Sequence, residues 1–342
     1  MNMKTVLQFI LSGEINMKIE TMRLKDVKQC LDIFNETTKQ SNFLYEPLTI
    51  EQFKTKFLKS GGDYLVLSFV LKEAEEIIGF ASGVYDPNGL KAYITMVIIN
   101  EPYRRKGFGK LLLNKLENSL HEKDLRLDKI DIVFFNPVQF NWIIPNTHVV
   151  HPNAPGVDMN SDAYLFFKRN GYVDFAHQNS YYRDITNYEF SPKTKKALDE
   201  VKEKGFEISY YNPNKHHGLA ELMDNLNSEG WRKEILNHAE QYNEKNTILV
   251  PTYHNLVVGF TGPLKVQPNK RGYFAGIGTH SEYRGHGLGK ALFASLVMGL
   301  KEMGAEYMTL FTGTNNPAKN MYEGEDFKVV RSWADMRKGL SL

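Results

Sequence analysis

"YRGHGLGKAL", residues 283–292, has a near copy earlier in the chain, "YRRKGFGKLL", residues 103–112. Each copy follows a β-rich stretch and opens a run whose apolar residues recur at helical spacing. The glycines let the backbone expose its N–H groups where the helix begins, and an arginine and the helix dipole add positive potential. This combination favours a phosphate or diphosphate ligand. The alternative for either copy alone is a tight turn that only starts a helix.

The order of predicted elements is also the same in both halves of the chain. In the first half we predict strands at 18–23, 63–71, 76–85, 92–99, 129–135 and 172–182, and helices at 24–38, 50–60, 108–120 and 161–171. In the second half we predict strands at 206–212, 247–253, 256–262, 273–280, 307–313 and 327–336, and helices at 217–226, 231–243, 287–300 and 317–325. Because 342 residues exceed what one core usually organises, we predict two tandem copies of one α/β (α+β) domain.

The predicted boundaries follow from this repeat. An extension covers residues 1–16, the N-terminal domain 17–186 and the C-terminal domain 206–342. Between the domains, residues 187–205 contain a charged, helix-favouring stretch that ends in glycine, which predicts a connecting helix. Residues 136–160 form an extra stretch rich in Pro and Asn in the first half. A loop of this length either covers the site of that half, lines the groove between the domains, or is a rigid surface excursion.

Composition narrows the possible partners. The 42 Lys and Arg residues nearly balance the 40 Asp and Glu residues, so no overall field favours nucleic acid or a membrane surface. The single cysteine, Cys30, cannot form an intramolecular disulfide and is predicted to be a core thiol, which favours a cytoplasmic location. The first 16 residues lack a convincing cleavage site, and no run of eighteen apolar residues predicts a transmembrane span. We therefore expect a small-molecule substrate and a monomer or homodimer.

The repeated phrase resembles the acetyl-coenzyme A loop of the GNAT N-acetyltransferase superfamily. It is neither the G-x-G-x-x-G fingerprint nor a P-loop. The pattern Arg-x-x-Gly-x-Gly is complete at residues 104–109 and again at 284–289. The resemblance implies that each domain has a mixed, mostly antiparallel central sheet flanked by helices.

A second motif of that family is an Asn-x-x-Ala-x-x-Leu-Tyr helix followed by Gly-Phe, whose tyrosine is commonly placed near the coenzyme sulfur. The sequence "NNPAKNMYEGEDF" supplies Asn315, Tyr322 and, in place of the glycine, Asp326, which tolerates a left-handed backbone. In the first half, "NSDAYLFFKRNGY" supplies Phe167 where the tyrosine is expected. The layout resembles mycothiol synthase-like tandem acetyltransferases, in which the C-terminal domain is catalytic.

The resemblance implies acetyl transfer from acetyl-coenzyme A to a primary amine by direct attack in a ternary complex, with Tyr322 protonating the leaving thiolate. Neither loop has a cysteine or a Ser–His pair near it, so we do not expect an acyl-enzyme. The residues implied to bind the coenzyme are Ile277, Gly278, Thr279, Arg284, Gly285, His286, Gly287, Leu288, Gly289, Lys290 and Asn315, with Arg104, Gly107 and Gly109 in the first copy. The acceptor amine stays open among amino acids, polyamines, aminoglycoside-like antibiotics and peptide N-termini.

Several alternatives remain at this stage. His280 and Glu229 are candidates for the general base, and a capping or solvated role is the alternative for each. The pairs His216-His217 and His148/His151 lack a third ligand at convincing spacing, so we expect exposed loop histidines and no metal. Rival functions are a non-catalytic coenzyme A binding or sensing protein and an aminoacyl-tRNA-dependent peptidyl transferase. The intact Tyr322 disfavours the first, and the near-neutral charge disfavours the second.

Overall fold

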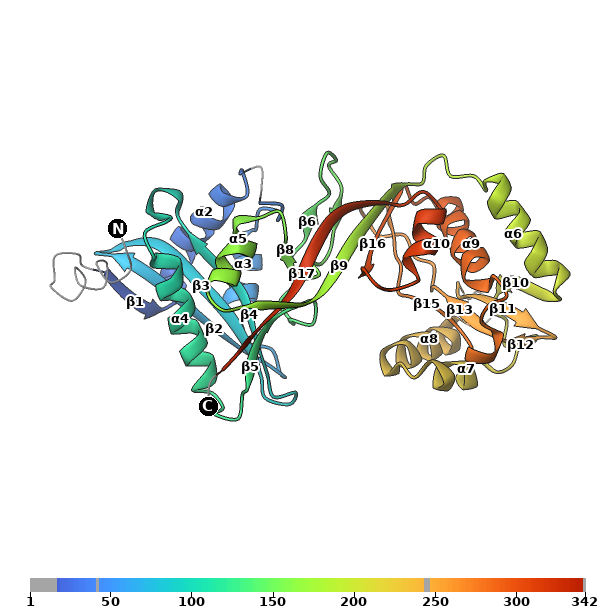
Figure 1. Ribbon diagram of the computed structural model, residues 1–342, viewed down its shortest axis with the longest axis horizontal. Coiled ribbons are helices and arrows are strands. Elements are labelled where there is room, and N and C mark those ends of the chain that lie inside the picture. The colour runs from blue at the N-terminus through green and yellow to red at the C-terminus, as the bar shows by residue number, and fades with distance from the viewer. Residues whose placement is uncertain (1–16, 41–42, 243–246, 341–342) are drawn as a thin grey trace. The chain divides into compact units, whose positions relative to one another are not determined.

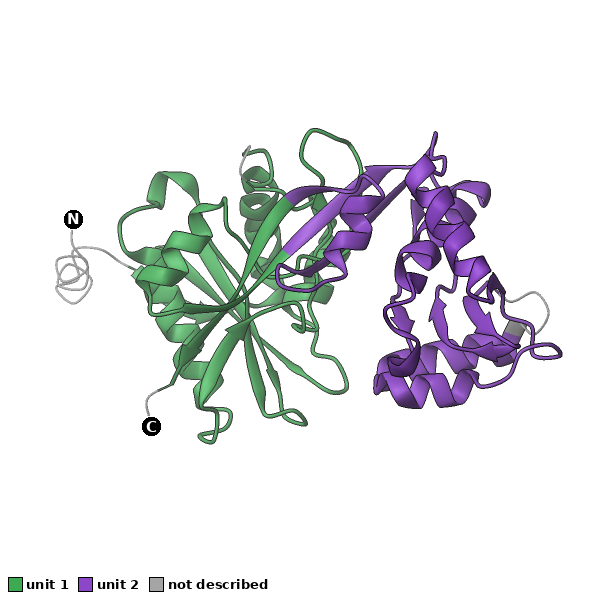
Figure 2. Cartoon of the chain, turned by 45° about the vertical axis from the view of Figure 1, so that its right-hand side comes forward, with its two compact units in different colours: residues 1–178, 331–342 green, residues 179–330 purple. Residues whose placement is uncertain are grey.

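The computed structural model describes residues 17–40, 43–242 and 247–340, so the predicted extension at 1–16 lies outside the described residues. The chain divides into two compact units (Figure 2). Unit 1 comprises residues 1–178 and 331–342, and unit 2 comprises residues 179–330. This division differs from the sequence-based one at the C-terminus, because residues 331–342 lie in unit 1.

Unit 1 contains the first copy of the predicted element order (Figure 1). Its elements are β1 (Met17–Thr21), η1 (Leu24–Asp26), α2 (Val27–Thr37), α3 (Ile50–Phe57), β2 (Leu65–Glu73), β3 (Glu76–Asp86), β4 (Lys91–Ile99), η2 (Glu101–Tyr103), α4 (Phe108–His121), β5 (Lys129–Ile132), β6 (Trp142–Ile143), β7 (Val150–His151), β8 (Val157–Asp158) and α5 (Asp162–Arg169). Strands β1 to β4 pair antiparallel in chain order, and β4 pairs with β5 in parallel.

Unit 2 repeats this order. Its elements are α6 (Pro192–Glu203), β10 (Phe206–Tyr210), α7 (Leu219–Leu226), α8 (Glu229–Tyr242), β11 (Leu249–Tyr253), β12 (Leu256–Val257), β13 (Gly259–Thr261), β14 (Arg271–Gly272), β15 (Ile277–Thr279), η4 (Ser281–Tyr283), α9 (Leu288–Glu302), β16 (Tyr307–Gly313) and α10 (Lys319–Gly324). One sheet of this unit runs β10-β11-β13-β15, and β14 pairs with β16 in another. Two copies of a mixed sheet flanked by helices are therefore confirmed.

The last strand completes the sheet of unit 1. Strand β17 (Lys328–Gly339) pairs antiparallel with β5 through residues 336–339, and with β8 through Trp333 and Ala334. Trp333 is 1% exposed and lies edge-on against the buried Trp142. Strand β9 (Val173–Asp184), the neighbour of β17 in the sheet, likewise contains residues of both units. The boundaries between the units thus fall within these two strands.

The helix after the repeated phrase covers the sheet of each unit as its periodicity predicts. The α4 residues predicted to share one face are all buried in the unit 1 core: Phe108, Leu112, Leu116 and Leu120. In unit 2, α9 buries Leu292, Leu296 and Leu300 in the equivalent core. At roughly 1.5 to 3 kcal/mol for each buried large apolar side chain, this face anchors the helix firmly. The N-terminal end that follows the glycines is thereby held in place.

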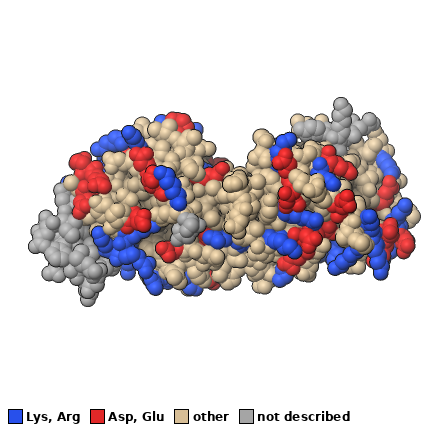
Figure 3. All heavy atoms as spheres, turned by 90° about the horizontal axis from the view of Figure 1, so that it is seen from above, with Lys and Arg blue, Asp and Glu red and all other residues tan. Residues whose placement is uncertain are grey.

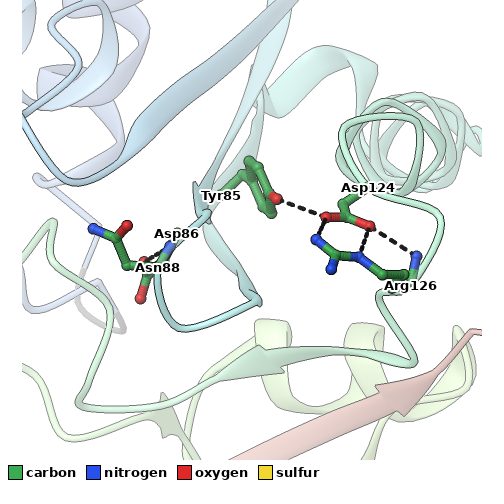
Figure 4. Close-up of polar contacts among 5 residues, drawn as sticks. All are labelled: Tyr85, Asp86, Asn88, Asp124 and Arg126. Atoms are coloured by element: carbon green, nitrogen blue, oxygen red, sulfur yellow. Dashed lines mark hydrogen bonds and ion pairs between the residues drawn. The ribbon is translucent and has the colours of Figure 1, made fainter.

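The end of α4 is tied back to the sheet by a polar cluster (Figure 4). Tyr85 at the end of β3 donates its hydroxyl to Asp124 at 3.2 Å, and Arg126 donates Nε and Nη2 to the same carboxylate at 2.9 and 2.6 Å. The Arg126 guanidinium holds the pKa of the Asp124 carboxyl well below its ordinary value. Beside this cluster, the Asp86 carboxylate accepts the N–H of Asn88 at 3.0 Å and so shapes the turn from β3 to β4.

Cys30 is completely buried in a core of unit 1, as predicted for a core thiol. Burial raises the pKa of this thiol well above its ordinary value, so it remains protonated. None of the described helices is both long enough and apolar enough to cross a membrane.

Candidate active site

The repeated phrase of unit 2 forms an anion cradle, by which we mean residues 285–290 at the start of α9. Gly285 and Gly287 have φ values of +84° and +87°, a left-handed conformation that disfavours other residues. The first backbone bond of the helix runs from Ala291 N to Gly287 O at 3.3 Å. Among the described residues, no acceptor is bound by the six N–H groups of 285–290. These donors and the dipole of a fifteen-residue helix suit a phosphate or diphosphate.

The side chains of the cradle differ in what they reach. Arg284, His286 and Lys290 are exposed, and Arg284 Nε donates to Thr279 O at 3.3 Å, which holds the arginine beside the strand end. Leu288 is 2% exposed and packs in the core, so only its N–H faces the cradle. A Cβ on Gly289 would lie 2.8 Å from Met321 Sδ. Gly289 therefore permits close packing of α9 on α10, and its side-chain direction does not face the anion.

The chain segment before the cradle passes from one sheet to the other. The pattern at 273–280 predicts one strand, but only 277–279 (β15) form a strand in that range and pair with β13, and β14 at 271–272 lies before the range and pairs with β16. Residues 273–276 pair with neither, so the two sheets separate here. We call residues 273–276 and the place where the two sheets separate the wedge. Because β15 is the last strand of its sheet, its far edge is open toward the wedge.

The three strand residues predicted to bind the coenzyme do not contribute equally. His280 N donates to Val258 O at 2.9 Å, which sets the phase of the antiparallel ladder. In that phase Gly278 points its main-chain groups at β13, whereas Ile277 and Thr279 point theirs at the open edge. A Cβ on Gly278 would meet Leu226 Cδ1 at 2.7 Å, so this glycine serves core packing.

Tyr322 lies on α10 with its ring buried and only 4% exposed. The ring packs against Phe293, Tyr181 and Phe274 with centroid distances of 4.9, 5.7 and 6.1 Å. Phe274 belongs to the wedge, so the tyrosine is positioned there. Its hydroxyl binds no other described residue. Burial raises its pKa to about 12, so at neutral pH the hydroxyl keeps its proton and can donate it.

A polar pair on the α8 side of the wedge was not anticipated from the sequence. Tyr273 donates its hydroxyl to Glu234 Oε1 of α8 at 3.1 Å. One turn earlier, Trp231 donates Nε1 to Ala275 O at 3.3 Å, and its ring lies directly against Gly276. Burial and the Glu234 carboxylate raise the pKa of Tyr273 to about 12. The only sequence signal for this pair was the helical spacing of Trp231 and Glu234.

The two candidate bases, His280 and Glu229, make different contacts from those of Glu234. His280 Nδ1 accepts the N–H of Glu282 at 3.3 Å and caps η4, as Asn100 does for η2 in unit 1. Glu229 is exposed at the first position of α8. Both match the capping or solvated alternatives. Asn315 is exposed after β16 and makes no hydrogen bond with its side chain among the described residues, whereas Asn316 Oδ1 accepts Ala318 N at 3.0 Å.

Unit 1 keeps the cradle. Arg105 and Gly107 take φ values of +63° and +91°, and the N–H groups of 105–110 bind no acceptor among the described residues. Arg104 is held differently from Arg284: its Nε donates to Ile99 O and its Nη1 to Gln40 Oε1, both at 2.8 Å. A Cβ on Gly109 would lie 3.2 Å from Phe166, so this glycine also serves helix packing.

The extra stretch of unit 1 begins with contacts to β4. Asn136 donates Nδ2 to Thr95 Oγ1 at 3.0 Å and to Ile94 O at 3.3 Å, where β4 and β5 separate. Val138 and Phe140 join the core that contains residues of β4. The first residues of the 136–160 stretch thus pack on β4, in a core separate from the one that contains Phe167. Phe167 is 7% exposed and has no hydroxyl to offer.

Of the four histidines predicted to be exposed, two are buried. His216 and His151 are buried, at 4% and 2% exposure, and each accepts a backbone N–H at Nδ1, from Asn212 and Asn153 respectively. His148 and His217 are exposed as expected. Within the residues that the structure describes, no group of three or more His, Cys, Asp or Glu could hold a metal ion.

The fold and the two cradles define a tandem acyltransferase architecture. Residues 28–136 and 216–326 both match the family model described as "Acetyltransferase (GNAT) family". The chain therefore belongs to the GNAT acetyltransferase family, and acyl transfer is the chemistry that this membership supports. A search of curated proteins gave no match.

Solved structures of the same fold cover nearly all of the chain. A GCN5-related N-acetyltransferase from Sphaerobacter thermophilus has a TM-score of 0.60 at 12% identity, covering 94% of this chain and 95% of its own. The tandem GNAT protein from the clavulanic acid biosynthesis pathway gives 0.57 at 12%, covering 95% and 99%. The glucosamine N-acetyltransferase region of a fungal GH3 β-N-acetylglucosaminidase gives 0.65 at 16%, covering 94% of this chain but 38% of that one. At these identities the likeness establishes the fold.

Proposed function

We propose that unit 2 is an N-acetyltransferase that moves the acetyl group of acetyl-coenzyme A to a primary amine of a small molecule. The observation that carries this proposal is the Tyr322 hydroxyl, which is buried at the wedge and bound to no described residue. The matching position of unit 1 is Phe167, which has no hydroxyl to donate. We therefore assign the chemistry to unit 2.

The residues present fit the coenzyme. Six free N–H groups at 285–290 and the charge of Arg284 suit its diphosphate. The main-chain groups of Ile277 and the N–H of Thr279, which point to the open edge of β15, suit its amide-containing arm, while Thr279 O accepts from Arg284. When bound, acetyl-coenzyme A supplies the thioester acetyl group. The chain then has to orient the reacting groups, exclude water and move protons.

We assign proton donation and proton acceptance to side chains on opposite sides of the wedge. Tyr322 Oη holds the proton for the leaving thiolate, and its raised pKa keeps that proton in place throughout the physiological range. On the α8 side we assign the amine to the Tyr273–Glu234 pair, because a carboxylate near a hydroxyl can bind an ammonium group and accept its proton. Trp231 closes this side against the backbone at Gly276.

A small molecule is the acceptor that the surface supports. In Figure 3, Lys and Arg side chains are interspersed with Asp and Glu side chains on the face shown. A protein that grips nucleic acid needs a basic stripe or patch. The interspersed charges therefore favour a small amine over an aminoacyl-tRNA.

The test is a thiol-release screen with acetyl-coenzyme A against amino acids, polyamines, aminoglycosides and short peptides. Stimulated release that depends on Tyr322 supports the transferase. Tight coenzyme binding by calorimetry with no release for any amine class would instead favour the coenzyme A sensing protein.

A second proposal concerns unit 1, whose 105–110 N–H groups are as free as those of unit 2. We infer that this cradle binds a coenzyme or its diphosphate without chemistry. Calorimetry of the whole chain tests it: two sites support the inference, and a single site abolished by changes in 285–290 contradicts it.

A further inference from the structure

The catalytic hydroxyl sits on a helix too short to hold itself in place. Helix α10 has six residues, below the length at which a helix is stable alone, and Tyr322 is its fourth. The Tyr322 hydroxyl has no partner among the described residues, so packing fixes the ring but no bond fixes the oxygen. Whatever holds the end of α10 therefore also decides where this oxygen lies.

Glu325, the C-terminal cap of α10, is bound by two hydroxyl groups. Tyr188 donates its hydroxyl to Oε2 at 2.7 Å, and Thr194 donates Oγ1 to Oε1 at 2.8 Å. The backbone oxygen of Glu325 also accepts from the Arg183 guanidinium. Both carboxylate oxygens and the main chain at the end of α10 are thereby fixed.

The groups that hold Glu325 are themselves rigid. Tyr188 is 1% exposed, and its backbone oxygen accepts Lys301 Nζ of α9 at 2.6 Å. Thr194 is 5% exposed and lies in the first turn of α6, where its N–H donates to Ser191 Oγ at 3.0 Å. Both residues come from the segment between the two repeats, which the sequence indicates only as a connection.

Helix α6 also reaches the cradle at its other end. A Cβ built on Gly287 would lie 3.7 Å from Val201, which is buried in the core shared with Leu288. Just beyond the helix, Lys204 Nζ donates to His286 O at 3.3 Å. One helix therefore contacts both the anion cradle and the residue that caps the tyrosine helix.

Unit 1 provides an internal comparison. The residue in register with Glu325 is Asn170, three positions after Phe167. Asn170 Nδ2 donates to Phe166 O at 2.8 Å, within its own helix, and its side chain bonds to no distant element in the described part of the chain. The copy that lacks the hydroxyl thus also lacks the carboxylate that would hold it.

We propose that Glu325 is a positioning residue for Tyr322, held by Tyr188 and Thr194 so that the segment between the repeats sets the place of the catalytic hydroxyl. This inference rests on the proposed function for its kinetic consequence. Its structural consequence, the fixed position of the Tyr322 ring, is independent of any activity.

The experiment uses the full chain labelled with 3-fluorotyrosine, in which the Tyr322 ¹⁹F resonance is identified by its loss in Tyr322→Phe. We expect Glu325→Ala and Thr194→Val to shift or broaden that resonance, because α10 loses its fixed end. Thr194→Val removes only one hydroxyl and keeps the proposal testable if Glu325→Ala folds poorly. Asn170→Ala, the matched change in unit 1, should leave the resonance unchanged.

Kinetics with a working amine provide the second arm. We expect Glu325→Ala to lower kcat by about tenfold to a hundredfold, as a small misplacement of a reacting group does, while the calorimetric Kd for coenzyme A stays within about twofold. In a Tyr322→Phe background the same change should add nothing. An unmoved Tyr322 resonance in both variants, or a full additional loss in the Tyr322→Phe background, overturns the proposal. A silent Tyr322→Phe change would contradict only the proposed acid, since the resonance still tests the positioning.

Discussion

The sharpest prediction is that Tyr322→Phe separates activity from stability. The phenylalanine ring can keep the contacts with Phe293, Tyr181 and Phe274, whose centroids lie 4.9 to 6.1 Å from that of Tyr322. No hydrogen bond to a described residue is lost, so the free energy of unfolding should change by less than about 1 kcal/mol. The rate should fall by roughly 10² to 10⁴-fold, because a proton donor is removed. That fall corresponds to about 3 to 5 kcal/mol of the activation barrier.

The assay is thiol release at saturating acetyl-coenzyme A and amine, combined with a thermal melt and a calorimetric Kd for coenzyme A. The pH dependence of the rate gives a further test, because the direction of the change can be predicted. The acid works only while protonated, so its loss of activity should occur as pH rises through a pKa of about 12, above the ordinary value of 10. No alkaline loss assigned to Tyr322 should therefore occur below about pH 11. Tyr85→Phe, which removes a hydroxyl bound to Asp124 at 3.2 Å in unit 1, is the matched control and should retain most of the turnover.

Two results would refute this reasoning. Unchanged turnover in a folded Tyr322→Phe protein would show that the hydroxyl is not the acid. A loss of turnover that tracks an equal loss of coenzyme affinity would show that the hydroxyl binds the coenzyme and does not donate a proton to it.

Three further predictions test the rest of the structure. Phe167→Tyr should not create a second active centre, because one added hydroxyl supplies only one of the groups that the reaction needs; release that persists in a Tyr322→Phe background would contradict this. Gly287→Ala should cost about 1 to 2 kcal/mol in a chemical denaturation curve, since its φ of +87° strains any Cβ, whereas Gly285→Arg should fold, because Arg105 already takes φ +63° at the matching place. Trp333→Ala should destabilise unit 1 by about 3 to 5 kcal/mol, because this buried ring packs on Trp142. Hydrogen exchange should then rise first in β5 and β8; a change confined to residues 179–330 would disprove that placement.

Much of the site could be predicted from local pattern, because its parts are local. The left-handed glycines, the free N–H groups and the helix dipole all arise within ten residues, so the phrase at 283–292 carries its own geometry. The same holds for the register of Tyr322, and for Asp326, whose φ of +58° bears out the expected left-handed turn. Helical spacing likewise placed Phe108, Leu112 and their neighbours in the core.

Pairing between distant segments could not be predicted in this way. Nothing in residues 331–339 states which sheet they join, because a strand's alternation fits any open edge of suitable length, and only the assembled chain offers β5 and β8 to it. The unpaired stretch at 273–276 also depends on distant segments, because β14 before it pairs with β16 and β15 after it pairs with β13. The Tyr273–Glu234 pair is missed for the same reason, because Glu234 of α8 meets Tyr273 only through tertiary folding.

The sequence by itself determined two copies of an acyltransferase domain and the backbone conformation of each cradle, because backbone conformation and helix polarity are properties of a few consecutive residues. Only the tertiary structure decided which groups surround the Tyr322 hydroxyl and what holds its helix. Tyr188 and Thr194 lie more than a hundred positions before Glu325 in the chain, and their hydroxyls reach its carboxylate because the folded core brings α6 and α10 together.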